Sequence, residues 1–336
     1  MAAATAVPGP GTAVPAVPGP GRSRASWAAM SKRLFGATAP PPTSPPVPLA
    51  PRRARLDLAY ADSSPAQRLD LYLPGESAPE VPVPLVVAIH GGGFAHGDKG
   101  DLVARLVDPM VAAGFAVASL NYRLSGEAPF PALVRDAKAA VRWLRAHADE
   151  HGTDPGAIGA IGESAGGWLA AMLGVTGDLD LELFDDPALG HPEVSSAVGA
   201  VVDLYGPMNF STMDAQVRAN PRCRASDAVH DAPDSPESRL LGRPITGAPE
   251  LVRAASPLAY LSPDRRPAPF LIEHGDTDCT VPFQQSEELA DALVAVGAPA
   301  RLAILRDAGH ADDFPTRARM PGILRFLDEK LRTGRR

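Results

Sequence analysis

The chain has few cysteines, few aromatic residues and no long hydrophobic run. Its two cysteines, Cys223 and Cys279, are too few for a disulfide-rich scaffold and form no C-x-x-C pair of the kind that binds zinc. Aromatic residues make up 5% of the 336 residues, so a core must rely on alanine, valine and leucine. Because no run of 18 apolar residues occurs, the sequence predicts no transmembrane helix. The start of the chain lacks the features of a signal peptide, which favours a cytoplasmic protein.

The chain also lacks a strong basic cluster. It carries 32 lysines and arginines against 39 acidic residues, a formal net charge of −7. Binding to nucleic acid needs clustered basic side chains that contact phosphates. We therefore expect neither nucleic acid nor a membrane as a partner, and the sequence leaves the oligomeric state open.

Residues 1–51 differ in composition from the rest of the chain. A-V-P-G-P-G occurs at 6–11 and again at 16–21, and a proline-rich stretch closes the segment. Dense proline removes backbone donors and favours an extended, solvated chain. The sequence predicts a disordered tail here. A proline-rich docking site is the alternative, and Met30 is a second candidate for the start of translation.

From residue 52 onward, apolar patterns alternate between those of strands and those of helices. Strands are predicted over 55–62, 67–74, 83–90, 115–122, 157–163, 197–206, 268–275 and 300–305. Helices are predicted over 101–113, 131–148, 165–174, 284–296 and 322–332. This alternation predicts an α/β fold over 52–333, with a mostly parallel sheet, an antiparallel opening pair and helices on both faces. The irregular segment 207–262 is predicted to be an insert or small cap.

The motif G-x-S-x-G occurs once in the required setting, between a predicted strand and a predicted helix. It comprises Gly162, Glu163, Ser164, Ala165 and Gly166. A sharp turn of this type exposes the serine oxygen, and the following helix directs its positive end at developing negative charge. We therefore predict that Ser164 is a nucleophile. The structural alternative is a tight turn without a chemical role.

A run of glycines follows the strand over 83–90, in the sequence H-G-G-G-F at 90–94. Acyl transfer passes through an oxyanion that needs backbone N–H donors, and glycines allow a close backbone approach. We predict donors at Gly92 and Gly93, together with the N–H of Ala165. A flexible glycine turn is the alternative interpretation.

A base and an acid are expected after the nucleophile, in the order acid and then histidine. His310 follows a predicted strand, at the edge of the sheet where active groups collect, and is the predicted base. Asp278 is the predicted acid because it fits G-x-x-D-x-x-V-P, whereas Asp276 is expected to stabilise the loop. His191 and His230 lie in irregular segments and are expected at the surface.

With these motifs in order, the chain resembles the bacterial feruloyl esterase-like carboxylesterases. This α/β-hydrolase group is a neighbour of the hormone-sensitive lipase-like esterases. The matching segments are H-G-G-G-F at 90–94, N-Y-R-L at 121–124, G-E-S-A-G-G at 162–167 and H-G-D-x-D-x-x-V-P at 274–282. The lipase-like relatives usually carry D-Y-R-L-A-P-E, where this chain has N-Y-R-L-S-G-E. The resemblance implies a serine esterase that cleaves short-to-medium acyl or aryl esters without a cofactor or metal.

Several alternatives stay open at this stage. An amidase, an arylformamidase-like enzyme or a transacylase would use the same triad, and a binding module on a hydrolase scaffold would usually lack one of its members. Phe94, Tyr122, Tyr205 and Phe314 are candidate substrate-pocket walls and equally candidates for the core. Cys223 could pair with Cys279 and fix the insert near the triad. A reducing cytoplasm favours two buried thiols instead.

Overall fold

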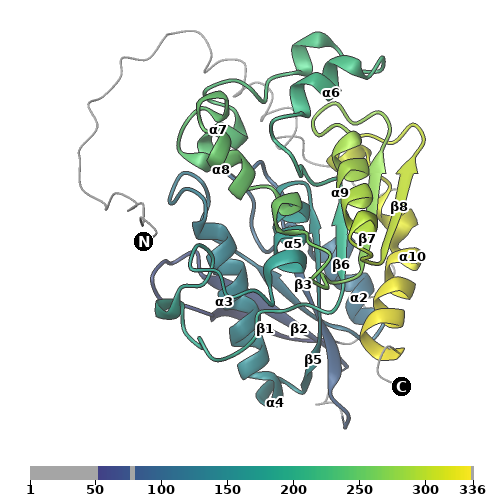
Figure 1. The fold of residues 1–336 in the computed structure, drawn as a ribbon. Coiled ribbons are helices and arrows are strands. Elements are labelled where there is room, and N and C mark those ends of the chain that lie inside the picture. Colours follow the sequence, from purple (N-terminus) through teal and green to yellow (C-terminus); the bar gives the residue numbers. More distant parts are fainter. Residues whose placement is uncertain (1–51, 76–79, 334–336) are drawn as a thin grey trace. The chain divides into compact units, whose positions relative to one another are not determined.

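The computed structural model describes residues 52–75 and 80–333, so the predicted tail over 1–51 lies outside them. Within the described residues, eight strands form one sheet in the order β1-β2-β4-β3-β5-β6-β7-β8 (Figure 1). β2 pairs antiparallel with both β1 and β4, and the remaining neighbours are parallel. The strands are β1 (Arg52–Ala59), β2 (Arg68–Pro74), β3 (Val83–Ile89), β4 (Ala116–Leu120), β5 (Thr153–Glu163), β6 (Val201–Leu204), β7 (Phe270–Gly275) and β8 (Ala300–Leu305).

Helices cover both faces of the sheet (Figure 1). In β3, Leu85, Val87 and Ile89 join the core beneath α3, α5 and α9, while Val86 and Ala88 face η1, α2 and α10. This alternation explains why a central strand is apolar at nearly every position. The longer helices are α3 (Ala132–Ala146), α5 (Ala165–Thr176), α9 (Gln284–Ala295) and α10 (Thr316–Asp328), and the shorter ones are η1 (Val103–Val107), α2 (Asp108–Ala112), α4 (Ala148–His151) and η7 (Glu329–Thr333).

The predicted fold class is confirmed, and two of the larger boundary errors occur at prolines. β5 begins at Thr153, four residues before the predicted strand. The prediction started too late because Pro155 interrupts the apolar pattern of the first residues of β5. α10 begins at Thr316, well before the predicted 322, and holds Pro321 within it. Proline has no N–H to donate and is best tolerated in the first turn of a helix. Pro321 therefore led to a predicted helix start at 322, although the helix begins five residues before this proline. None of the helices in 52–75 and 80–333 has the length and apolarity to span a bilayer.

The segment 207–262 is more regular than its sequence suggests. It contains α6 (Met213–Ala219), α7 (Pro236–Leu241) and α8 (Pro249–Ala254), with 3-10 turns at η3 (Ala225–Asp227), η4 (Ile245–Gly247) and η5 (Pro257–Tyr260). Helices of six or seven residues complete too few turns to show a clear period in the sequence. His230, expected at the surface, is instead buried, with Nδ1 3.1 Å from Glu237 Oε1.

A disulfide joins Cys223 of this segment to Cys279, which lies in the turn after β7. The expectation of two thiols is therefore wrong, since residues 56 apart in sequence come within 5.4 Å at their Cα atoms. Asn220 supports the same contact by donating to the Asp276 carbonyl at 3.2 Å. The insert is thus fastened to the turn that carries the predicted acid.

We expect replacement of both cysteines by serine to lower the free energy of unfolding by about 2–4 kcal/mol, because the unfolded chain regains the freedom of a long loop. Urea unfolding, followed by circular dichroism, measures this difference. Dithiothreitol should destabilise the wild type by a similar amount and leave the double variant unchanged. Equal stability of the two proteins without reductant would contradict the expectation.

Candidate active site

Ser164 lies in a sharp turn between β5 and α5, with backbone angles φ 55° and ψ −121°. Both flanking glycines are required by close backbone contacts. A Cβ at Gly162 would lie 2.0 Å from the Gly166 carbonyl oxygen, and one at Gly166 would lie 2.1 Å from the Ile89 carbonyl oxygen. No side chain fits at such distances, so the motif is a steric requirement of the turn.

The structure brings together the three residues predicted to act as nucleophile, base and acid. His310 Nε2 lies 3.0 Å from Ser164 Oγ, and His310 Nδ1 lies 2.6 Å from Asp278 Oδ2. Ser164 directly follows β5, Asp278 lies three residues after the end of β7, and His310 lies five residues after the end of β8. Parallel strands end at one edge of the sheet, which is why segments distant in sequence meet there.

Asp278 is fully buried and held by backbone donors. Its Oδ1 accepts hydrogen bonds from the N–H groups of Thr280 and Val281, both at 2.9 Å. Burial raises the pKa of Asp278, but the neighbouring His310 and hydrogen bonds from His274 and His310 outweigh it and hold the pKa well below its usual range. The carboxylate is therefore ionised at neutral pH.

The glycine loop after β3 runs beside Ser164. Gly92 and Gly93 have positive φ angles of 113° and 58°. His90 braces the loop: its ring stacks on Tyr122 with centroids 4.5 Å apart, and the Tyr122 hydroxyl donates to the His90 carbonyl at 2.9 Å. Burial lowers the pKa of His90, which keeps this histidine neutral. The predicted donors at Gly92, Gly93 and Ala165 remain predictions.

The contact between this loop and the nucleophile gives a test. A Cβ at Gly91 would lie 2.8 Å from the Glu163 carbonyl oxygen and 3.2 Å from Ser164 Cβ, so Gly91→Ala must push the loop away from Ser164. Loss of one oxyanion donor typically costs about 100- to 1000-fold in rate. We expect a fall of that size in kcat for ester hydrolysis, measured with p-nitrophenyl butyrate.

Gly126→Ala is the matched control, because a Cβ at Gly126 meets no atom within 4 Å. It should retain wild-type kcat. A Gly91→Ala protein that is folded by circular dichroism and turns over at the wild-type rate would contradict the role of this loop.

The four aromatic residues predicted as pocket walls are all buried. Phe94 packs edge-on against Trp168 and Phe210, at centroid distances of 5.4 and 5.9 Å. Tyr205 lies against the ring of His310 at 4.8 Å and also contacts Phe314 at 4.8 Å. Two of the four, Tyr205 and Phe314, thus lie around the candidate base. Their role as walls stays a prediction.

Beneath the nucleophile lies an ionic cluster that the sequence does not reveal. Glu163, the variable residue before Ser164, is buried, and Arg105 of η1 approaches its Oε2 to 2.7 Å. Burial raises the pKa of Glu163, and Arg105 and the Tyr205 hydroxyl oppose that rise. Glu163 is the last residue of β5 and was assigned only as part of the motif, while nothing in the sequence connects it with Arg105. The ion pair thus holds in place the residue that directly precedes Ser164.

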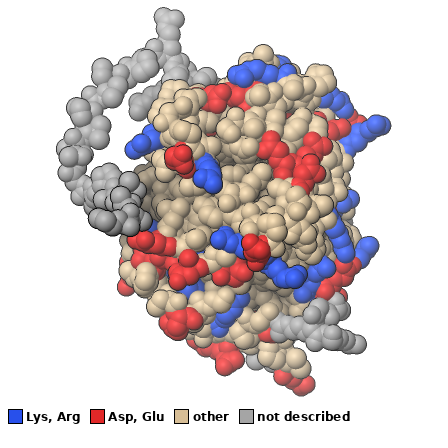
Figure 2. All heavy atoms as spheres, viewed as in Figure 1, with Lys and Arg blue, Asp and Glu red and all other residues tan. Residues whose placement is uncertain are grey.

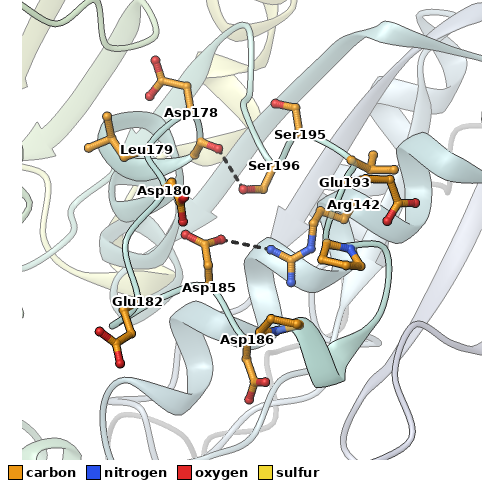
Figure 3. A pocket seen from close by; sticks show the side chains of 14 residues that line it. Arg142, Asp178, Leu179, Asp180, Glu182, Asp185, Asp186, Glu193, Ser195 and Ser196 are labelled. Atoms are coloured by element: carbon orange, nitrogen blue, oxygen red, sulfur yellow. Dashed lines mark hydrogen bonds and ion pairs between the residues drawn. The ribbon is translucent and has the colours of Figure 1, made fainter.

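Two hollows open on the described surface. One of about 620 Å³ opens at the end of α5 remote from Ser164, where Arg142 donates to Asp185 at 3.2 Å (Figure 3). Another, of about 660 Å³, is lined by residues of 209–259. Neither is lined by Ser164, Asp278 or His310.

Charge and metal-binding groups give no competing site on the described residues. On the face shown in Figure 2, basic and acidic side chains are interspersed. Within 52–75 and 80–333, no three His, Cys, Asp or Glu side chains are grouped as a metal ion would need. The Ser164–His310–Asp278 arrangement therefore remains the best-defined chemical site.

The sheet order and the strand–turn–helix around Ser164 define an α/β-hydrolase fold. The model of the BD-FAE family matches residues 69–293, so the chain belongs to this family. The resemblance found in the sequence is thereby confirmed.

Individual relatives are named esterases. Esterase LipC of Mycobacterium tuberculosis is 32% identical over 288 residues, which cover 83% of this chain and 66% of LipC. Esterase LipQ of the same organism is 28% identical over 78% of this chain and 58% of its own length. The chain therefore spans less than two thirds of these relatives. Among solved structures, a truncated carbohydrate esterase from gut microbiota superposes with a TM-score of 0.72 at 29% identity, covering 85% of this chain and 99% of that one.

Proposed function

We propose that this protein hydrolyses carboxylic esters with Ser164 as nucleophile, His310 as general base and Asp278 as the acid that orients it. The observation that carries the proposal is the position of His310, whose two ring nitrogens lie 3.0 Å from Ser164 Oγ and 2.6 Å from Asp278 Oδ2. A base between a hydroxyl and a carboxylate is the arrangement that activates a serine. The esterase names of its relatives support ester hydrolysis as the reaction.

In the proposed reaction, His310 takes the Ser164 proton while Oγ attacks the ester carbonyl carbon. The backbone N–H groups of Gly92, Gly93 and Ala165 bind the resulting oxyanion. His310 then returns the proton to the alcohol that leaves. Water, activated by the same histidine, cleaves the acyl-enzyme and regenerates the serine. Asp278 stabilises the imidazolium formed in each half of the cycle.

We propose short-to-medium acyl or aryl esters as substrates and 52–333 as the catalytic domain. The test is turnover of p-nitrophenyl acetate, butyrate and decanoate beside the corresponding p-nitroanilides. We expect turnover of the esters, with the chain-length profile reporting the size of the acyl site. Turnover of the anilides alone would replace the esterase by an amidase, since the same atoms serve both reactions. A folded protein that turns over neither series would overturn the proposal.

The identity of the nucleophile can be tested separately. A fluorophosphonate reacts with an activated serine and leaves a stable adduct that peptide mass spectrometry locates. We expect the adduct on Ser164.

A further inference from the structure

A second histidine contacts the carboxylate that faces His310. His274, the fifth residue of β7, is fully buried, and its Nε2 lies 3.2 Å from Asp278 Oδ2. That is the same oxygen that lies 2.6 Å from His310 Nδ1. His274 Nε2 also lies 2.9 Å from the Val281 carbonyl oxygen. Since an ionised carboxylate and a carbonyl can only accept, Nε2 of His274 carries the proton.

The other ring nitrogen of His274 meets a hydroxyl group. Its Nδ1 lies 2.7 Å from the Oγ of Ser286, a fully buried residue of α9. A serine hydroxyl can donate, and Nδ1 of an imidazole protonated at Nε2 can accept. Ser286 thus supports the one tautomer in which His274 donates to Asp278. It does so without adding a charge that would cancel the carboxylate facing His310.

The four donors to Asp278 divide evenly between its two oxygens. Oδ1 takes the N–H groups of Thr280 and Val281, and Oδ2 takes His274 and His310. The backbone donors fix one end of the carboxylate. Oδ2 has two hydrogen-bond partners among the described residues, His310 and His274. His274 is therefore the one that holds Oδ2 in place for His310. The orientation of Oδ2 toward His310 therefore depends on His274.

We propose that His274 is a positioning residue for the reaction and that Ser286 fixes its tautomer. This rests on the proposed triad, because His274 acts through Asp278 and touches neither the ester nor Ser164. Two other groups face the His274 ring from neighbouring elements. Asp203 of β6 is buried, which raises its pKa to about 7, and the Tyr205 ring lies 6.4 Å away.

The test compares kcat, KM and the acid limb of the pH–rate profile in three variants of the full chain, with p-nitrophenyl butyrate as substrate. His274→Leu removes the donor. His274→Gln keeps an N–H near the position of Nε2. Ser286→Ala removes the hydroxyl that fixes the tautomer. His151→Leu is the control, because His151 is also buried but lies at the opposite end of β5 from Ser164.

We expect His274→Leu to lower kcat about 100-fold with little change in KM, the cost of a misplaced catalytic group. Its acid limb should move to higher pH, because a carboxylate that has lost a donor is more basic and retains the imidazolium more strongly. His274→Gln should keep the wild-type limb and most of kcat. Ser286→Ala should lose about two- to tenfold in kcat, the value of one hydrogen bond.

Wild-type kcat and an unmoved acid limb in His274→Leu would overturn the inference, as would equal losses in the leucine and glutamine variants. If His274→Leu does not fold, Ser286→Ala decides, since unchanged kcat in that variant contradicts the role of the tautomer. Ser164→Ala distinguishes failure of the proposed esterase function from failure of the positioning role of His274. Activity retained in Ser164→Ala would contradict the proposed function, whereas an inactive Ser164→Ala beside a His274→Leu with wild-type activity would contradict this inference alone.

Discussion

Ser164→Ala should lower kcat for ester hydrolysis by about 10⁴- to 10⁶-fold while leaving the fold intact. The variant loses the atom that attacks the carbonyl, and His310 is left without a hydroxyl at 3.0 Å. A small residual rate over water is expected from the oxyanion donors and from substrate binding. Initial rates with p-nitrophenyl butyrate measure the loss, and circular dichroism establishes that the protein is folded.

Ser195→Ala is the matched control for removal of a hydroxyl. Ser195 is exposed and lines the hollow at the remote end of α5. It should retain wild-type kcat. A Ser164→Ala protein with rates within a factor of ten of wild type would assign the activity to another group, and the proposed mechanism would have to be abandoned.

Asp278→Asn should lower kcat by about 10⁴-fold, the size of effect measured for the equivalent change in a serine protease triad. The new amide group can present an N–H to His310 Nδ1, which would favour the wrong tautomer of the base. It also removes the negative charge beside the imidazolium. The acid limb expected in the wild-type pH dependence of kcat/KM, measured with the same ester, should move to lower pH in the variant, because the imidazolium has lost the neighbouring negative charge.

Asp276→Asn tests whether this effect belongs to one carboxylate. Asp276 lies two residues away, and its Oδ1 accepts a hydrogen bond from the Asp307 N–H at 2.7 Å. An asparagine retains an oxygen for that contact, so we expect near-wild-type kcat. Equal losses in the two variants would indicate a general disturbance of the turn and not a specific role for Asp278.

The sequence was sufficient for the parts of the site that depend on local geometry. Gly162 and Gly166 are dictated by close backbone contacts around one turn, so their spacing predicts the turn that carries Ser164 without knowledge of the rest. His310 could be predicted because parallel strands end at one edge of the sheet, and Asp278 because it fits G-x-x-D-x-x-V-P.

Contacts between side chains that are distant in sequence were beyond the same reasoning. Arg105 reaches Glu163 across the layer between η1 and β5, and neither residue lies in a pattern that specifies the other. His274 lies at the end of a predicted strand, and a histidine there gives no sign of which acceptors its nitrogens meet. The pairing of Cys223 with Cys279 required the path of the insert, and its short helices carry too weak a period to trace it.

The disulfide has a consequence for cutting the chain. Any peptide bond between Cys223 and Cys279 can be hydrolysed without separating the two products, because the bridge holds one to the other. Gly242, Arg243 and Pro244 form an exposed stretch inside this interval, the type of site that proteases nick and that tolerates new termini. A protein nicked there would migrate as one band on a non-reducing gel and as two after reduction. The same stretch is therefore a natural place to open the chain for circular permutation or for insertion of a second domain.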